Sequence, residues 1–198
     1  MSYKNENMKM IELHENGLDI QFRIRENGVV ELADFSSQEV KKAAMEPKED
    51  IYYPAVEIHR SGTGSLNMHA YKNNINQSSV DFVYENHELK AQAGGKELEI
   101  VMISPEKLKA VYHMRLFDGV PAVQTWTEII NEGSEEQGLT YVSSFMYQGI
   151  SRGGEKPYYK KTDIYVPFNS WCCEAQWQKY DAETLLSLIH ISEPTRPY

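Results

Sequence analysis

The feature of this sequence that most limits its fold is a repeated alternation of apolar and polar residues. Ile20, Phe22 and Ile24, for example, alternate with charged or amide residues between positions 19 and 25. Such alternation places one side of an extended chain on a core and the other in water, as in antiparallel strands. The pattern predicts strands at residues 19–25, 29–35, 55–59, 80–85, 98–103, 109–116, 123–130 and 139–147.

Turn residues separate these segments, and they predict how the strands are joined. Asn-Gly pairs supply the positive φ angles that two-residue hairpin loops require, so Asn27-Gly28 predicts a hairpin. Further reversals are expected at Asn16-Gly17, Gly94-Gly95, Asp118-Gly119 and Glu132-Gly133. Many closely spaced strands predict an all-β fold, a large antiparallel β-sandwich. One short helix is expected at residues 37–45, ended by Pro47, and polar loops at 61–77 and 148–161.

Charge and composition narrow the classes of partner. The net charge of −9 argues against nucleic acid and anionic membranes, because no basic stripe is present to neutralise phosphates. No segment approaches the ~20 apolar residues that a membrane-spanning helix needs. The polar N-terminus lacks a signal-peptide core, so we expect a cytoplasmic protein. Cys172 and Cys173 are adjacent and are expected to be reduced, since a vicinal disulfide is strained.

The sequence lacks the common motifs of cofactor and covalent chemistry. Gly62-x-Gly64 has no later glycine and no following helix, and no Gly-x-Ser-x-Gly elbow occurs. No histidine pairs with another at a spacing of three or four residues, so we expect neither a cofactor nor a metal site. His113 is expected to be solvated on the polar side of its strand, and His59 to line a loop mouth.

Acidic residues are too numerous to identify a catalytic pair. A glycosidase needs two carboxylates across the scissile bond, but sequence does not pair residues across a sheet. Glu57 and Glu174 have the least surface-like contexts among the 29 acids. We expect each to be a buried acid that is hydrogen-bonded to backbone or to arginine.

Residues 165–177 differ in character from the rest of the chain. Trp171 and Trp177 flank Glu174, and Asn169 lies just before them. Aromatic faces beside amide and carboxylate groups suit sugar rings, and the same composition suits an interface between domains. Both interpretations stay open, and Trp171, Glu174, Trp177 and Asn169 are the candidates for a substrate-facing or interface-facing role.

Several segments, in order, resemble the N-terminal domain of glycoside hydrolase family 36. They begin with Leu18-Asp-Ile-Gln-Phe-Arg-Ile-Arg-Glu-Asn-Gly-Val-Val-Glu-Leu and Tyr53-Pro-Ala-Val-Glu-Ile-His-Arg-Ser-Gly-Thr-Gly64. Val123-Gln-Thr-Trp-Thr-Glu-Ile-Ile-Asn-Glu-Gly133 is similar to a family strand that ends in an Asn-x-Gly turn, and residues 169–177 are also similar. The likeness spans about residues 10–185.

This resemblance implies a fold and a parent activity. Family members are retaining α-galactosidases and α-N-acetylgalactosaminidases with an N-terminal β-supersandwich of the galactose-mutarotase type, a catalytic (β/α)₈ barrel and a small C-terminal β-domain. Their two catalytic aspartates lie on the barrel, so this chain is expected to be inactive alone, with no catalytic residue of its own. Its expected partners are the parent's barrel and other subunits of a homo-oligomer, with α-galactosides as the parent's substrate.

The C-terminal segment, Leu186-Ser-Leu-Ile-His-Ile-Ser-Glu-Pro-Thr-Arg-Pro-Tyr198, resembles a translated sequencing adapter. We therefore expect residues 1–185 to be the N-terminal sandwich domain, cut before the barrel, and residues 186–198 to be non-native. Two other hypotheses stay open: a stand-alone carbohydrate-binding module, in which a tryptophan stacks on sugar, and a purely structural sandwich. A shared fold does not distinguish among them.

Overall fold

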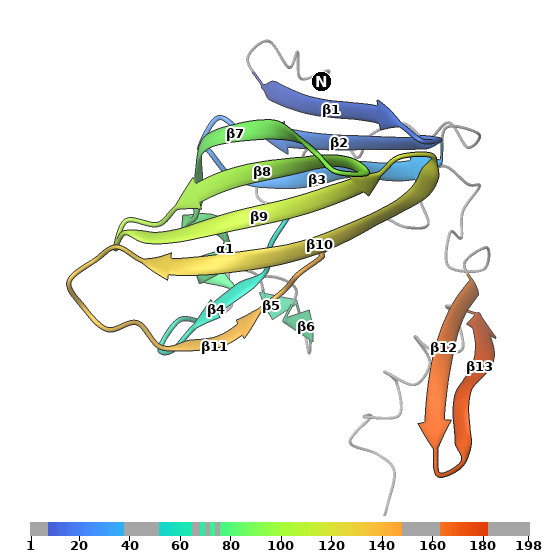
Figure 1. Ribbon diagram of the computed structural model, residues 1–198. Coiled ribbons are helices and arrows are strands. Elements are labelled where there is room, and N and C mark those ends of the chain that lie inside the picture. Colours follow the sequence, from blue (N-terminus) through green and yellow to red (C-terminus); the bar gives the residue numbers. More distant parts are fainter. Residues whose placement is uncertain are drawn as a thin grey trace, which may run out of the picture. The chain divides into compact units, whose positions relative to one another are not determined.

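The computed structural model describes residues 8–37, 52–64, 68–69, 72–73, 76–147 and 163–181. The chain divides into two compact units, Met1–Gln148 and Gly149–Tyr198. Almost all of the described secondary structure is strand, and every strand pair is antiparallel (Figure 1). The predicted all-β antiparallel fold is therefore confirmed. The helix expected at residues 37–45, the 148–161 loop and the 186–198 tail lie almost wholly outside the described residues.

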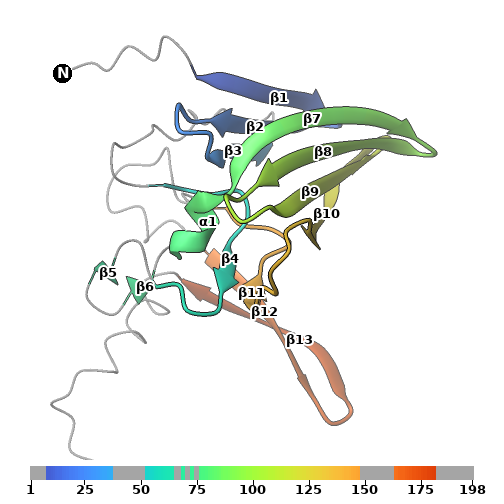
Figure 2. The ribbon, with the colours of Figure 1, turned by 90° about the vertical axis from the view of Figure 1, so that its left-hand side faces the viewer.

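Two antiparallel sheets form the sandwich of the first unit (Figures 1 and 2). One has the order β1-β2-β3, comprising Lys9–Glu15, Leu18–Ile24 and Val30–Ser37. The other has the order β10-β9-β8-β7, comprising Val120–Asn131, Leu108–Phe117, Gly95–Ile103 and Val83–Gln92. A bridge between Val29 and Val83 joins the two sheets at one side.

Period-two alternation explains why these sheets pack face to face. Ile20 and Phe22 of β2 and Tyr112 and Met114 of β9 have no exposed side-chain surface and belong to one hydrophobic core. The rings of Phe22 and Tyr112 meet edge to face across the sandwich, with centroids 5.7 Å apart. Full burial of such side chains contributes about 1.5–3 kcal/mol each, so this shared core is what holds the two sheets together.

The two Asn-Gly turns have different geometries. Asn16 and Gly17 both have positive φ, as a two-residue hairpin loop between β1 and β2 requires. At the second turn only Gly28 has positive φ, 86°. Its N–H donates to the Arg25 carbonyl over 2.8 Å, which makes a turn followed by a glycine bulge. The predicted hairpin at Asn27-Gly28 is confirmed, but its loop is not of the two-residue type.

Smaller elements complete the first unit. β4, Ile58–Arg60, pairs with β11, Leu139–Val142, and the short helix α1 is Gln77–Asp81. The Asn76 side chain accepts from Ser78 N–H and caps the helix. The strand predicted at residues 80–85 is therefore wrong in its first part, since Val80 lies in α1 and β7 begins at Val83. Within the 61–77 segment, expected to be a loop, β5, Met68–His69, pairs with β6, Lys72–Asn73.

The second unit contains one described hairpin, formed by β12, Asp163–Ser170, and β13, Cys173–Asp181. Neither strand was predicted, and β1 was also missed. Within the described part of the chain, no helix is long and apolar enough to cross a membrane.

Candidate functional site

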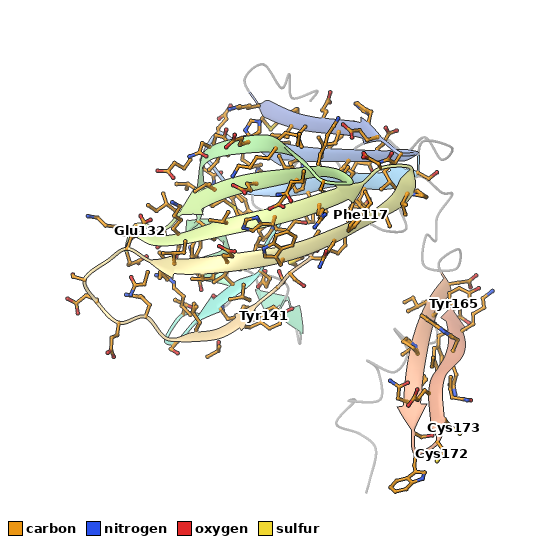
Figure 3. All side chains as sticks on the ribbon, in the orientation of Figure 1. Phe117, Glu132, Tyr141, Tyr165, Cys172 and Cys173 are labelled. Atoms are coloured by element: carbon orange, nitrogen blue, oxygen red, sulfur yellow. The ribbon has the colours of Figure 1, made fainter. Side chains whose placement is uncertain are left out.

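The four candidate residues of the 165–177 segment lie on the β12–β13 hairpin. Trp171 and Cys172 form its turn, and Figure 3 shows Cys172 and Cys173 at the tip, with Tyr165 toward the other end. The Asn169 side chain accepts a hydrogen bond from the Ala175 N–H over 2.7 Å, which holds the two strands together beyond the register shift after Phe168. Asn169 and Glu174 line a shallow, open depression on this hairpin.

Both tryptophans are exposed, Trp171 by 93% and Trp177 by 64%. Glu174 is also exposed, so the expectation that it is a buried acid is wrong. The structure thus brings Asn169 and Glu174 to one depression, with Trp171 at the adjacent tip. An open depression of this kind offers stacking and hydrogen-bonding groups but encloses no ligand.

Glu57 differs from Glu174 because the sandwich covers it. Its Oε1 accepts from the Asn76 backbone N–H over 2.8 Å and lies 2.9 Å from Nε2 of His59. The prediction that Glu57 is a buried acid bonded to backbone is confirmed. These contacts pin the start of α1 to β4, which is a structural role. His59 is partly exposed and stacks obliquely on Tyr141.

A second group of polar residues lies on the face of the four-stranded sheet that is turned away from the core. Cross-strand register places Glu88, Glu99, His113 and Trp126 in one row, from β7 to β10. The neighbouring row contains Glu97, which pairs with Lys90 and Arg115. This face therefore gathers carboxylates from β7, β8 and β10 around the single histidine of β9.

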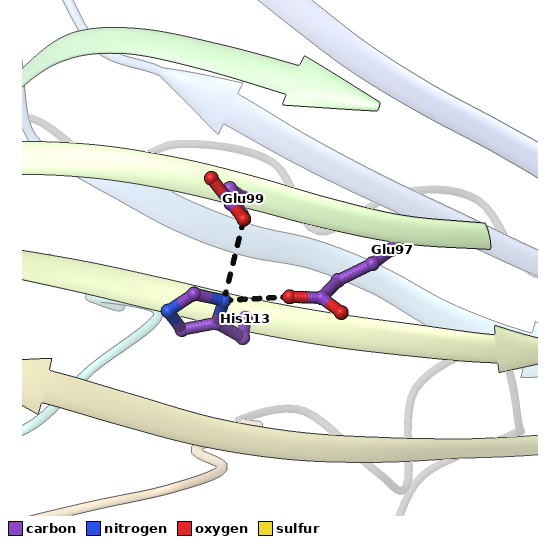
Figure 4. Close-up of side chains that lie close together, drawn as sticks. All are labelled: Glu97, Glu99 and His113. Atoms are coloured by element: carbon purple, nitrogen blue, oxygen red, sulfur yellow. Dashed lines mark hydrogen bonds and ion pairs between the residues drawn. The ribbon is translucent and has the colours of Figure 1, made fainter. Parts of the chain in front are cut away.

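His113 is the centre of this group, and its predicted solvation is wrong because the side chains around it leave it only 7% exposed. Its Nδ1 lies 2.9 Å from Oε1 of Glu97 and 3.9 Å from Oε1 of Glu99 (Figure 4). The Trp126 ring stacks on the imidazole, with centroids 4.6 Å apart and planes 5° from parallel. Stacking on one side and carboxylates at the edge fix the orientation of the imidazole ring.

The same carboxylates are held from their outer sides. Gln92 Nε2 donates to Oε2 of Glu97 over 2.6 Å, and the Lys90 ammonium bonds to Oε2 of Glu99. This bond to Glu99 raises the pKa of Lys90 above its ordinary value, so the lysine stays charged. Each glutamate therefore directs only its Oε1 toward His113.

Sequence reasoning missed this group because it searched for histidines close to one another along the chain. Glu97 and His113 are 16 residues apart and come together only through pairing of β8 with β9. A signal was present in Glu97-x-Glu99, since residues two apart on a strand share a face. The strand that would supply a third group was not identifiable from spacing.

Comparison with known proteins adds no family to this picture. No protein-family model matches the chain, and no curated protein matches it.

Proposed function

We propose that this chain is the non-catalytic N-terminal β-sandwich of a retaining α-galactosidase-type glycoside hydrolase. In this proposal the parent's barrel carries the two catalytic aspartates, and the sandwich supports that barrel, the substrate entrance and contacts between subunits in the cytoplasm. Support comes from the ordered motifs at residues 18–32, 53–64, 123–133 and 169–177 together with the all-β sandwich. The surface of the β12–β13 hairpin is the observation that carries the interface role.

This hairpin has apolar side chains on both of its faces. Period-two alternation and register place Ile164, Phe168 and Tyr180 on one face. Tyr165 and Trp177 share the other. An isolated two-stranded hairpin is marginally stable in water, and three or more strands or a packed face are normally required. We infer that a partner surface covers at least one face.

The buried area of the two tryptophans gives the free energy that such a contact could supply. A Trp side chain buries about 150–250 Å², which at ~25 cal/mol per Å² corresponds to about 4–6 kcal/mol before the costs of ordering. Trp171 at the tip and Trp177 on a strand are the anchors that an interface with a barrel domain or a neighbouring subunit would use, since tryptophan is enriched among dominant contact residues.

The first experiment is to read the coding sequence that follows codon 185 in an intact copy of the gene. We expect a barrel with two suitably placed aspartates, whereas a stop codon there would overturn the proposal. In the intact parent, Trp171→Ala with Trp177→Ala should lower the melting temperature and weaken subunit or domain association. In this chain alone the same double change should leave the melting temperature nearly unaltered, because both tryptophans are exposed.

A stand-alone carbohydrate-binding module is the second candidate, favoured by the depression that Asn169 and Glu174 line near the exposed Trp171. Calorimetric titration of the chain with galactose, melibiose and raffinose tests it. The module hypothesis predicts binding that Trp171→Ala or Trp177→Ala weakens at least tenfold. Absence of heat with all three sugars would count against it and favour the interface role.

A further inference from the structure

The three side chains Glu97, Glu99 and His113 present one ligand atom each to a common point. Glu97 Oε1, Glu99 Oε1 and His113 Nδ1 all lie within 4.8 Å of one another. Around zinc, ligand bonds of about 2.0–2.2 Å in a tetrahedron put neighbouring ligand atoms about 3.4 Å apart. The distances from Nδ1, 2.9 Å to Glu97 and 3.9 Å to Glu99, bracket that value. Small side-chain rotations would therefore suffice to admit an ion.

A second, independent observation concerns the other nitrogen of the imidazole. His113 Nε2 is buried and has no hydrogen-bond partner among the described residues. An ionised carboxylate only accepts, so the bond to Glu97 puts a proton on Nδ1, and in the neutral ring this leaves Nε2 as an unpaired acceptor. Leaving a buried polar atom unpaired is unfavourable, because the atom has lost its water without gaining a partner.

A metal ion bound at Nδ1 would take the place of the proton there and turn Nε2 from an unpaired acceptor into a donor. The ring proton then resides on Nε2, where it faces Glu128 Oε1 at 3.8 Å. A histidine that binds metal through one nitrogen almost always donates its other N–H to a carboxylate, carbonyl or water. Glu128 is largely exposed, so its side chain is free to close the remaining distance.

The outer contacts of the two glutamates fit the same arrangement. Gln92 holds Oε2 of Glu97, and Lys90 holds Oε2 of Glu99, so each carboxylate keeps one oxygen for the ion. Metal-binding carboxylates are commonly hydrogen-bonded in this way. Charge also favours a cation: on this face Glu88, Glu97, Glu99 and Glu128 outnumber the cations Lys90, Lys109 and Arg115. Glu99 is partly exposed and provides the side from which an ion and a water ligand enter.

We propose that Glu97, Glu99 and His113 bind one divalent transition-metal ion of the zinc type on the outer face of the β7–β10 sheet. One imidazole and two carboxylates match the ligands that Zn²⁺ takes when a fourth position is left for water or substrate. The proposal is independent of the hydrolase assignment, because it rests on the sheet alone.

The test is a calorimetric titration of the full chain with Zn²⁺, carried out with Cys172→Ser and Cys173→Ser because exposed thiols can bind zinc and would obscure the titration. We expect one ion per chain. Glu99→Gln should weaken binding at least tenfold. Glu128→Ala removes the exposed carboxylate that faces Nε2 without endangering folding, and it should weaken binding about tenfold, as loss of an outer partner does.

His14→Gln is the matched control, since His14 also lies near two carboxylates, Asp19 and Glu12, but its side chain is exposed. It should leave zinc affinity unchanged. Nitrogen-15 NMR of the imidazole should show His113 as the Nε2–H tautomer with zinc and the Nδ1–H tautomer without. Unchanged His113 signals at saturating zinc, equal affinity in the Glu99→Gln and unaltered chains, or loss of binding in His14→Gln would each overturn the proposal.

Discussion

Replacing Gly28 by alanine tests how the two sheets are joined. Gly28 has φ of 86°, a conformation that costs an L-residue about 1–2 kcal/mol. A Cβ built there would lie 2.8 Å from the Val83 Cβ, next to the Val29–Val83 bridge. The Tyr84 N–H also donates to the Gly28 carbonyl over 2.8 Å, so a shift of this backbone disturbs the hydrogen bond that links the sheets.

The expected magnitude is the sum of three terms. Conformational strain contributes about 1–2 kcal/mol and overpacking against Val83 about 1–3 kcal/mol. The smaller conformational freedom of alanine in the unfolded chain stabilises the variant by about 0.4–1 kcal/mol, which subtracts from this loss. The Gly28→Ala chain should therefore lose about 1–4.6 kcal/mol of unfolding free energy. With a urea slope of about 2 kcal/mol per M, its midpoint should fall by about 0.5–2.3 M.

Gly17→Ala is the matched control for this measurement. Gly17 also follows an asparagine in a turn and has φ of 81°, but a Cβ there meets no atom within 4 Å. The control should lose only about 1 kcal/mol, because strain acts without overpacking. Urea unfolding of both variants, followed by circular dichroism, isolates the contact with Val83 as the difference. Equal losses in the two variants would refute the reasoning that the Gly28–Val83 approach is rigid.

Three further predictions concern the ionisable side chains Glu31, Tyr112 and His14. Glu31→Gln removes a fully buried carboxylate that bonds to Arg23 over 2.7 Å. Chemical unfolding should show a loss of about 3–5 kcal/mol of stability, and a loss below 1 kcal/mol would contradict this. Burial raises the pKa of Tyr112, so above about pH 10, the ordinary tyrosine pKa, this group ionises in the unfolded chain but not in the native state. Stability should therefore fall as the pH rises above about 10, and Tyr112→Phe should remove that dependence. The hydrogen bond to Asp19 raises the pKa of His14. In Asp19→Asn, NMR titration should show the His14 pKa closer to its ordinary value, and an unchanged pKa would exclude this cause.

Much of the sandwich was predictable because its strands follow a local rule. Ile20, Phe22 and Ile24 identify β2 by alternation alone, and Asn27-Gly28 identifies the reversal after it. β1 and the polar part of β7 were missed because edge strands carry many polar residues. The true start of β7 depends on the Asn76 cap, which begins a helix at residues 77–81 although Val80 fits an alternation with Phe82 and Tyr84.

The candidate sites also differ in how far the sequence could predict them. Trp171, Trp177, Asn169 and Glu174 were selectable from composition, and the hairpin places them on exposed surface. Whether Glu174 would be buried was not decidable from its neighbours in sequence, because burial depends on what packs above a strand. The group around His113 lay beyond sequence reasoning because its members come from four strands, β7 to β10.

The sequence by itself indicated most strands of the sandwich, most of the turns and the antiparallel class of this protein, since side-chain alternation and backbone preferences act within a few residues. It also carried the motifs on which the hydrolase proposal depends. Tertiary structure alone decided that Gly28 must accommodate Val83, that Glu57 is buried and Glu174 exposed, and that His113 lies among Glu97, Glu99 and Glu128. These facts depend on register between strands, and register joins residues that local forces do not relate.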